Sequence, residues 1–351
     1  MTATAYKHDI YSKSEGKVYM TGIQALVRLP MVQRTLDRQR GFNTAGLVSG
    51  YRGSPLGAYD QQLWKASKQL AEHDVVFQPG LNEDLAATAL WGAQIHKAYG
   101  DTTVDGVFGV WYGKGPGVDR TGDVFRTANM LGTSKLGGVL AVSGDDHAAQ
   151  SSMYPHQTDG IFQSASIPIL QPANVQEILS LGLAGFEMSR YAGVWVALKT
   201  IAEVVETAAT FDLSDVPQFN TPSDYKLPAH GLNWDPTIAW PEKRAELERR
   251  MIEERMPAVK AWAKANKLDQ TLVKAHQSRL GIVTVGKAHQ DFMQAMEDLG
   301  LNATDLANMG VSVYKVAMSW PLETDGILSF AAGQSELMVV EEKRGIVEAQ
   351  I

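Results

Sequence analysis

Short apolar segments alternate with longer helical patterns along the N-terminal part of the chain, and most of the apolar segments end in a polar or glycine-rich loop. This alternation predicts strands and helices in turn, and therefore a parallel α/β sheet. In such sheets, ligands bind beyond the carboxyl ends of the strands. The loops expected at that edge are residues 50–57, 80–84, 113–120 and 144–152.

Residues 18–40 are predicted as a helix because apolar side chains recur on one side at helical spacing. The other helices predicted in this part are residues 59–73, 83–99, 118–131 and 175–190. The predicted strands are residues 44–50, 75–77, 105–112, 138–143, 168–172 and 194–199.

A chain of 351 residues is too long for one ordinary core and fits two domains. Residues 1–17 are predicted to be a loose arm, residues 18–215 a first domain and residues 216–279 a linker with a charged helical segment at 241–278. Five prolines between residues 214 and 241 favour an extended linker. A smaller α/β domain is predicted for residues 280–351. Its expected strands are 281–285, 311–317 and 336–341, and its expected helices are 288–299 and 323–332.

The composition excludes several classes of protein. An apolar fraction of 44% and a charged fraction of 20% are typical of a soluble globular protein. A net charge of −7 argues against nucleic-acid binding, and no apolar run is long enough to span a membrane. The absence of cysteine excludes disulfides, thiol catalysis and cysteine-ligated metal clusters in this chain. Residues 1–17 lack the apolar core of a signal peptide, so a cytoplasmic location is expected.

The stretch from Val75 to Ala93 carries the main candidate for chemistry. A short apolar strand turns at Pro79-Gly80, and a helix of small residues follows. Asn82 is a good N-cap, and Glu83 falls at the positive end of the helix dipole. Acids are common in a first helical turn. However, a carboxylate at the end of a small-residue helix can pack close to other backbone, where its surroundings would set its pKa.

Two glycine-rich loops are further candidates. In the loop from Gly50 to Gly57, the backbone N–H groups of Gly53 and Ser54 and the Ser54 hydroxyl could hold a carboxylate, although an ordinary strand-to-helix turn explains the pattern equally well. The segment Gly113-Lys-Gly-Pro-Gly directly follows a strand, and its glycines would allow the backbone to approach an anion closely. The alternative is a flexible turn.

Ionisable residues are dense in the loop that begins Gly144-Asp-Asp-His. The spacing of Asp145, Asp146 and His147 fits no familiar metal-ligand pattern, which favours a hydrogen-bonded loop near the site. The tryptophans Trp91, Trp111 and Trp195 lie in or beside apolar runs and are predicted to belong to the core.

Five motifs occur in a characteristic order: Gly50-Tyr-Arg-Gly-Ser-Pro, Pro79-Gly-Leu-Asn-Glu, Gly113-Lys-Gly-Pro-Gly, Gly144-Asp-Asp-His-Ala-Ala-Gln-Ser-Ser and Ile167-Pro-Ile-Leu-Gln-Pro-Ala. As a set they resemble the N-terminal part of indolepyruvate ferredoxin oxidoreductases, which belong to the thiamine-diphosphate-dependent 2-oxoacid:ferredoxin oxidoreductases. The long fused bacterial form is the most similar. The resemblance starts near Val18 and implies that residues 18–215 are a pyrimidine-binding domain. It implies that residues 280–351 are a transketolase C-terminal-like domain, with Val339-Val-Glu-Glu as the signature of the last strand.

The resemblance assigns roles to individual residues. Glu83 matches the family's activating glutamate, whose carboxyl hydrogen-bonds the pyrimidine of thiamine diphosphate and promotes loss of the thiazolium proton. Ser54 replaces the threonine that contacts the substrate carboxylate, beside Gly53, and Arg52 replaces a proline of the family's loop. The segment with Lys114, Gly115 and Gly117 lies where related enzymes line the thiamine site.

The family binds the cofactor diphosphate through Mg²⁺ and a Gly-Asp-Gly motif in a separate domain, and no such motif occurs here. The resemblance therefore implies half of an active site, completed by a partner domain or subunit and dimeric as a whole. The implied reaction is oxidative decarboxylation of an aryl 2-oxo acid to an acyl-CoA with reduction of ferredoxin, the Mg²⁺ site and iron–sulfur clusters lying outside this chain. Two alternatives remain open, namely a non-oxidative thiamine decarboxylase or transferase and a non-catalytic scaffold or regulatory module.

Overall fold

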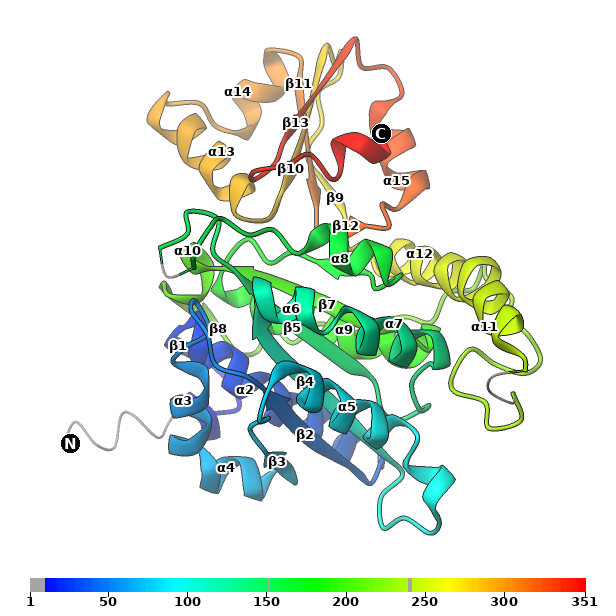
Figure 1. The fold of residues 1–351 in the computed structure, drawn as a ribbon. Coiled ribbons are helices and arrows are strands. Elements are labelled where there is room, and N and C mark those ends of the chain that lie inside the picture. Colours follow the sequence, from blue (N-terminus) through cyan, green and yellow to red (C-terminus); the bar gives the residue numbers. More distant parts are fainter. Residues whose placement is uncertain (1–9, 151, 239–241) are drawn as a thin grey trace, which may run out of the picture.

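The computed structural model describes residues 10–150, 152–238 and 242–351, which form two α/β units that lie one above the other in Figure 1. The larger, N-terminal unit is built on a seven-stranded sheet with the order β12-β6-β7-β5-β4-β2-β3. The smaller, C-terminal unit is built on a four-stranded sheet with the order β13-β10-β11-β9. Both sheets are mainly parallel, which confirms the predicted fold class.

The strands of the seven-stranded sheet are β2 (Thr44–Gly50), β3 (Val75–Phe77), β4 (Gly106–Lys114), β5 (Val139–Asp145), β6 (Ile169–Leu170), β7 (Trp195–Ile201) and β12 (Met318–Trp320). All neighbouring pairs are parallel except β6 and β12, which are antiparallel. The carboxyl ends of β2, β3, β4 and β5 therefore meet at one edge, as the sequence predicted. β12 comes from the part of the sequence predicted to be the second domain.

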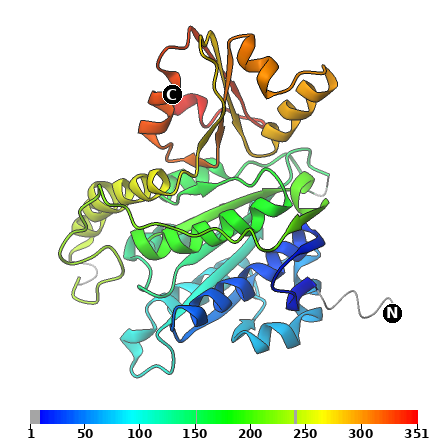
Figure 2. The ribbon, with the colours of Figure 1, turned by 180° about the vertical axis from the view of Figure 1, so that it is seen from behind.

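Helices cover both faces of this sheet. The first face carries α2 (Gly22–Gln39) and α9 (Val175–Ala192), seen in front in Figure 2. The second face carries α5 (Glu83–Gln94), α6 (Gly115–Arg120) and α7 (Gly122–Leu131), seen in front in Figure 1. Each face encloses its own apolar cluster, and Trp111 and Trp195 are fully buried in the second, while Trp91 packs against it.

The remaining short elements of the N-terminal unit are α3 (Tyr59–Lys65), α4 (Ser67–Glu72), η1 (His96–Tyr99), α8 (Asp159–Ser164), α10 (Ala202–Val205), β1 (Lys17–Thr21) and β8 (Ala208–Asp212).

Two of the predictions for this unit are wrong in detail. The predicted helix at 18–40 begins only at Gly22, because Thr21 is extended and caps it through a capping box with Gln24, while β1 pairs with β8. The glycine loop predicted at residues 113–117 is also wrong, because these residues belong to a strand and a helix. Strand β4 continues to Lys114, and α6 begins at Gly115 with Pro116 in its first turn.

The C-terminal unit contains β9 (Gln270–Val273), β10 (Leu280–Val285), α13 (Gly286–Asp298), α14 (Ala303–Asn308), β11 (Val311–Val316), α15 (Thr324–Ala331), β13 (Glu336–Val340) and η3 (Glu348–Gln350). The segment predicted as helical at 241–278 contains α11 (Arg244–Arg250), a π-helical turn (Met251–Arg255) and α12 (Met256–Ala265). It ends in the edge strand β9, so the helical prediction is wrong there. In the described part of the chain, no helix is both long and apolar enough to cross a membrane.

Candidate active site

The loops that follow β2, β3 and β4 lie against one another at the carboxyl edge of the sheet. The Gly80 amide donates a hydrogen bond to the Gly50 carbonyl at 2.9 Å, and the Gln78 amide donates to Val48 at 3.0 Å. The Tyr51 amide donates to the Tyr112 carbonyl at 3.0 Å. These backbone bonds bring the predicted site loops together.

Helix α5 presents Glu83 at this edge. The Asn82 side chain caps the helix by accepting a hydrogen bond from the Leu85 amide at 2.9 Å. The indole N–H of Trp111 on β4 donates to the Glu83 carbonyl at 3.1 Å, which fixes the first turn of α5 against the sheet. Glu83 itself is half-buried. Its neighbour Asp84 instead pairs with Arg120 at 3.0 Å, and this pair raises the pKa of the Arg120 guanidinium.

The Glu83 side chain lies directly on Gly117 of α6. A Cβ atom at Gly117 would come within 2.7 Å of both Cγ and Oε1 of Glu83. No real Cβ tolerates such a contact, so the glycine makes room for the carboxyl group.

The other two predicted loops meet in the same way. The stem of Lys114 lies over Gly53, where a Cβ would come within 2.8 Å of the lysine Cδ. Pro55 and Leu56 of the same loop pack on Gly144, where a Cβ would meet the Leu56 Cγ at 2.8 Å. The structure therefore places Gly53 beside Lys114 and places Ser54 in the loop next to both, while Arg52 is exposed to solvent.

The sequence did not predict His156. Its ring lies against Gly115, at the start of α6, and a Cβ at Gly115 would collide with the imidazole. Its Nδ1 is buried and has no hydrogen-bond partner within residues 10–150, 152–238 and 242–351. His156 lies in an irregular segment, where no periodicity indicates the direction of a side chain.

The glycines in these loops make room for ionisable side chains. A Cβ at Gly53, Gly115 or Gly117 would meet Lys114, His156 or Glu83, respectively, and the approach of their backbone to an anion stays a prediction. The three glycines let these ionisable side chains lie flat on the loops. At this edge of the sheet, the Glu83 carboxyl and the His156 imidazole can exchange protons, and the Lys114 ammonium group can attract anions.

The charged end of β5 has a structural role. Asp145 is buried and accepts hydrogen bonds from the Thr158 amide at 2.9 Å and hydroxyl at 3.1 Å. Lys199 on β7 bonds Asp159 at 2.6 Å and lies 3.7 Å from Asp145. Among the residues that the structure describes, no cluster of three or more His, Asp or Glu is arranged to hold a metal ion.

His147 links this buried cluster to the C-terminal unit. Its ring nitrogens lie 3.8 Å from Asp145 and 3.7 Å from Glu342, which follows β13. The Ala288 amide donates to Glu342 at 2.9 Å. Burial raises the pKa of the Glu342 carboxyl, opposed by the positive charge of Lys199 and by His147. The two units are thus joined by charged groups beside the candidate site.

Comparison with known proteins shows similarity in both sequence and fold. Residues 270–351 match the family model described as the indolepyruvate oxidoreductase domain. The indolepyruvate oxidoreductase subunit IorA of Methanothermobacter marburgensis is 24% identical over 347 residues, covering 98% of this chain and 50% of that protein. The IorA subunit of Archaeoglobus fulgidus is 22% identical over 357 residues, with the same two coverages.

Solved structures share the fold. The 2-oxoglutarate:ferredoxin oxidoreductase of Magnetococcus marinus, solved with 2-oxoglutarate, coenzyme A and succinyl-CoA bound, superposes with a TM-score of 0.66 at 14% identity. The match covers 95% of this chain and 59% of that chain. A transketolase from Pichia stipitis gives a TM-score of 0.52 at 13% identity, covering 96% and 43%.

The chain spans about half the length of the curated relatives that it matches. The resemblance predicted from the five motifs is confirmed: the chain is similar to IorA subunits of indolepyruvate oxidoreductase over almost all of its length, and it has the fold of a 2-oxoacid:ferredoxin oxidoreductase.

Proposed function

We propose that this chain supplies the pyrimidine-binding half of a thiamine diphosphate site in a 2-oxo acid oxidoreductase of the indolepyruvate type. The observation that carries the proposal is the placement of Glu83, which lies half-buried at the N-terminus of α5 with its carboxyl packed on Gly117. A carboxylate held in this way, at an edge where ligands bind in parallel sheets, suits proton exchange with a bound heterocycle.

The residues present fit the cofactor's pyrimidine. Glu83 would hold a proton at its carboxyl and share it with a ring nitrogen. The backbone carbonyl of Glu83 is held by Trp111, so the carboxyl starts from a fixed backbone position. When bound, thiamine diphosphate supplies the carbon nucleophile that attacks the 2-oxo acid. Gly115 and Gly117, with Lys114, would line the same site from the start of α6.

The same geometry supports a proposal for the residues that bind the substrate. Ser54 and the Gly53 amide would bind the carboxylate of an aryl 2-oxo acid, and the adjacent Lys114 would add a positive charge. Arg52 is exposed and would meet the substrate or the partner half from outside. The partner would bind the diphosphate with Mg²⁺ and carry the coenzyme A and ferredoxin steps. We further propose that residues 18–215 and 280–351 correspond to the two family domains and that the complete enzyme is a cytoplasmic dimer.

The test replaces Glu83 by glutamine in the complete enzyme, formed with its partner half and loaded with thiamine diphosphate. Glutamine keeps the shape of the side chain but cannot exchange a carboxyl proton, so hydrogen–deuterium exchange at the thiazolium carbon should slow by roughly 10²- to 10⁴-fold. The matched control is Asp84→Asn, which removes the neighbouring charge and its pair with Arg120. Equal exchange rates in wild type and Glu83→Gln would show that Glu83 is only a helix-start acid.

A further inference from the structure

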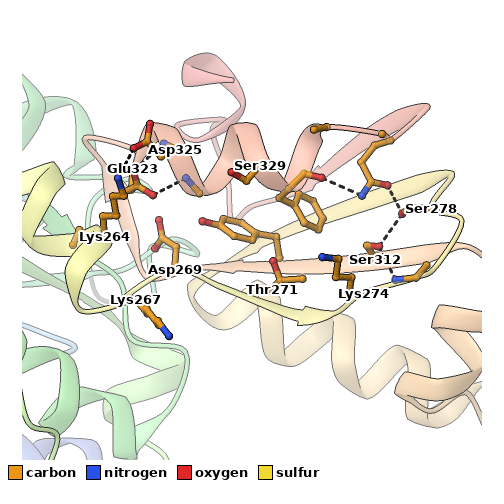
Figure 3. Close-up of a pocket in the computed structure, with 18 of the residues that line it drawn as sticks. Lys264, Lys267, Asp269, Thr271, Lys274, Ser278, Ser312, Glu323, Asp325 and Ser329 are labelled. Atoms are coloured by element: carbon orange, nitrogen blue, oxygen red, sulfur yellow. Dashed lines mark hydrogen bonds and ion pairs between the residues drawn. The ribbon is translucent and has the colours of Figure 1, made fainter. Parts of the chain in front are cut away.

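A cavity of about 580 Å³ lies in the C-terminal unit, away from the candidate active site. It lies between strands β9 and β11 on one side and α15 on the other (Figure 3). Its volume is in the range of pockets that bind small molecules. Nothing in the proposed function uses it.

Asp269 and Glu323 line one end of the cavity, and neither carboxyl group is paired with a lysine or arginine among the described residues. Asp269 uses its Oδ1 to accept hydrogen bonds from the Ala317 amide at 2.7 Å and the Met318 amide at 3.1 Å. Its Oδ2 is buried and has no hydrogen-bond partner among the residues that the structure describes. Glu323 is 7% exposed and accepts from the Asp325 and Gly326 amides at the start of α15. In the described part of the chain, neither carboxyl has an ion pair within 4.0 Å.

The nearby positive charges are directed elsewhere. Lys264 lines the same end, but it pairs with Asp325 at 2.8 Å and with Asp224 at 3.1 Å. Lys267 also lines the cavity, and within the described part of the chain it forms no ion pair with either carboxyl. Burial raises the pKa of Asp269 to about 7, and the negative charge of Glu323 adds to this shift. Tyr314, whose pKa is raised mainly by burial and further by both carboxylates, faces them from β11.

The other end of the cavity has the opposite character. In Figure 3, Lys274 and the hydroxyls of Ser278 and Ser312 lie toward the end away from Asp269 and Glu323. The two hydroxyls are hydrogen-bonded to each other at 2.8 Å, and Ser278 also bonds Gln334. Lys274 has no ion pair among the described residues. Between the two ends lies the stacked pair of Tyr314 and Phe330, with ring centres 5.0 Å apart.

We propose that this cavity binds an elongated organic amine, with its ammonium group between Asp269 and Glu323 and an anionic far end toward Lys274. An ammonium group would give the Asp269 Oδ2 the donor that it lacks and would offset two buried negative charges. A metal ion is a poorer fit, because the described residues include no group of three or more His, Asp or Glu arranged to hold one, and Asp269 and Glu323 already accept backbone hydrogen bonds. The methylene chain of the ligand would pass the Tyr314 and Phe330 rings.

The test is isothermal titration calorimetry of the full chain with 6-aminohexanoate at low ionic strength, compared with hexanoate and pentylamine. We expect 6-aminohexanoate to bind, pentylamine to bind more weakly and hexanoate not to bind. Asp269→Asn should raise the dissociation constant at least about tenfold, as expected for loss of a charged hydrogen bond. Binding in wild type should weaken as the pH is lowered below 7, because Asp269 becomes protonated, and this weakening should be smaller in Asp269→Asn. His276 also lines the cavity and is present in both proteins, so the difference between them isolates Asp269.

Two more variants keep the test decisive if Asp269→Asn fails to fold. Glu323→Gln should weaken binding to a similar extent, and Ser329→Trp should abolish it by filling the cavity from the exposed side of α15. The matched control is Asp298→Asn on α13, which removes an equal charge elsewhere and should leave binding unchanged. Hexanoate that binds as tightly as 6-aminohexanoate would overturn the proposal, and so would undetectable binding of all three probes or binding that survives Ser329→Trp. Activity of the complete enzyme does not enter this test, so its outcome is independent of the proposed function.

Discussion

Gly117→Ala separates the role of Glu83 in the site from any role in folding. The added Cβ would lie 2.7 Å from both Cγ and Oε1 of Glu83 and 3.1 Å from Cδ. Ordinary carbon contacts begin at about 3.5 Å, so the carboxyl group must move by roughly 0.8 Å or more. A displacement of about 1 Å in a reacting group can lower a rate about 10²-fold.

The same substitution should leave folding almost unaffected. Gly117 lies inside α6, where alanine is favoured over glycine by up to about 1 kcal/mol. The obstructing group is the end of a half-buried side chain, which can rotate away at a small cost. We therefore expect the free energy of unfolding to change by less than about 1 kcal/mol, measured by urea denaturation.

The assay is hydrogen–deuterium exchange at the thiazolium carbon in the complete, cofactor-loaded enzyme. We expect exchange to slow by roughly 10²-fold in Gly117→Ala. The control is Gly92→Ala in α5, the helix that carries Glu83, because a Cβ there meets no other atom within 4 Å. The reasoning is refuted if Gly117→Ala folds normally and exchanges at the wild-type rate, since the position of the Glu83 carboxyl would then not matter.

Three further predictions concern the substrate, the cofactor and pH. Ser54→Ala should raise KM for the 2-oxo acid and leave the cofactor affinity unchanged. The loss of binding free energy should be roughly 1.5–3 kcal/mol, the contribution of one hydrogen bond to a charged group. Steady-state kinetics that match wild type would remove Ser54 from the site. The isolated chain should bind thiamine diphosphate weakly or not at all by calorimetry with Mg²⁺ present, and tight binding would contradict the assignment of the diphosphate site to the partner. Burial raises the pKa of Asp269 from 3.8 to about 7, so its neutral form is favoured in the folded state. Stability should therefore fall as pH rises from about 4 to 7, by an amount on the order of 4 kcal/mol, and Asp269→Asn should flatten this part of the urea-denaturation profile.

The sequence predicts the parts of the fold that carry strong local patterns. The buried strands β2, β4, β5 and β7 are rich in apolar residues, and the polar loops that follow β2, β4 and β5 mark the edge where the candidate site lies. The strands β1, β9 and β12 were missed because their pairing partners are distant in sequence. In β9, for example, three of the four residues are exposed, so the segment has no apolar pattern. It is a strand because it pairs with β11.

The site could be predicted only in part, for a similar reason. A capped helix start identifies Glu83, and the glycine pattern identifies the neighbouring segment. Glycine is required at Gly53, Gly115 and Gly117 because a side chain from elsewhere in the fold occupies the space where a Cβ would lie. Such a tertiary contact cannot be read from local sequence. His156 approaches Gly115 from an irregular segment forty-one positions further along the chain, so local sequence gives no sign of it.

The position of β12 limits how the chain can be divided for experiments. Met318 and Trp320 pair with Leu170 and Ile169, and the Gln171 amide donates to the Ala317 carbonyl at 2.9 Å. A fragment that stopped near residue 279 would leave this side of β6 without its neighbour, exposing unpaired backbone and two fully buried apolar side chains. Bare strand edges of this kind promote intermolecular pairing and aggregation. Expression of the first 279 residues alone should therefore yield associating material, and supplying residues 280–351 as a separate fragment should restore a monodisperse complex.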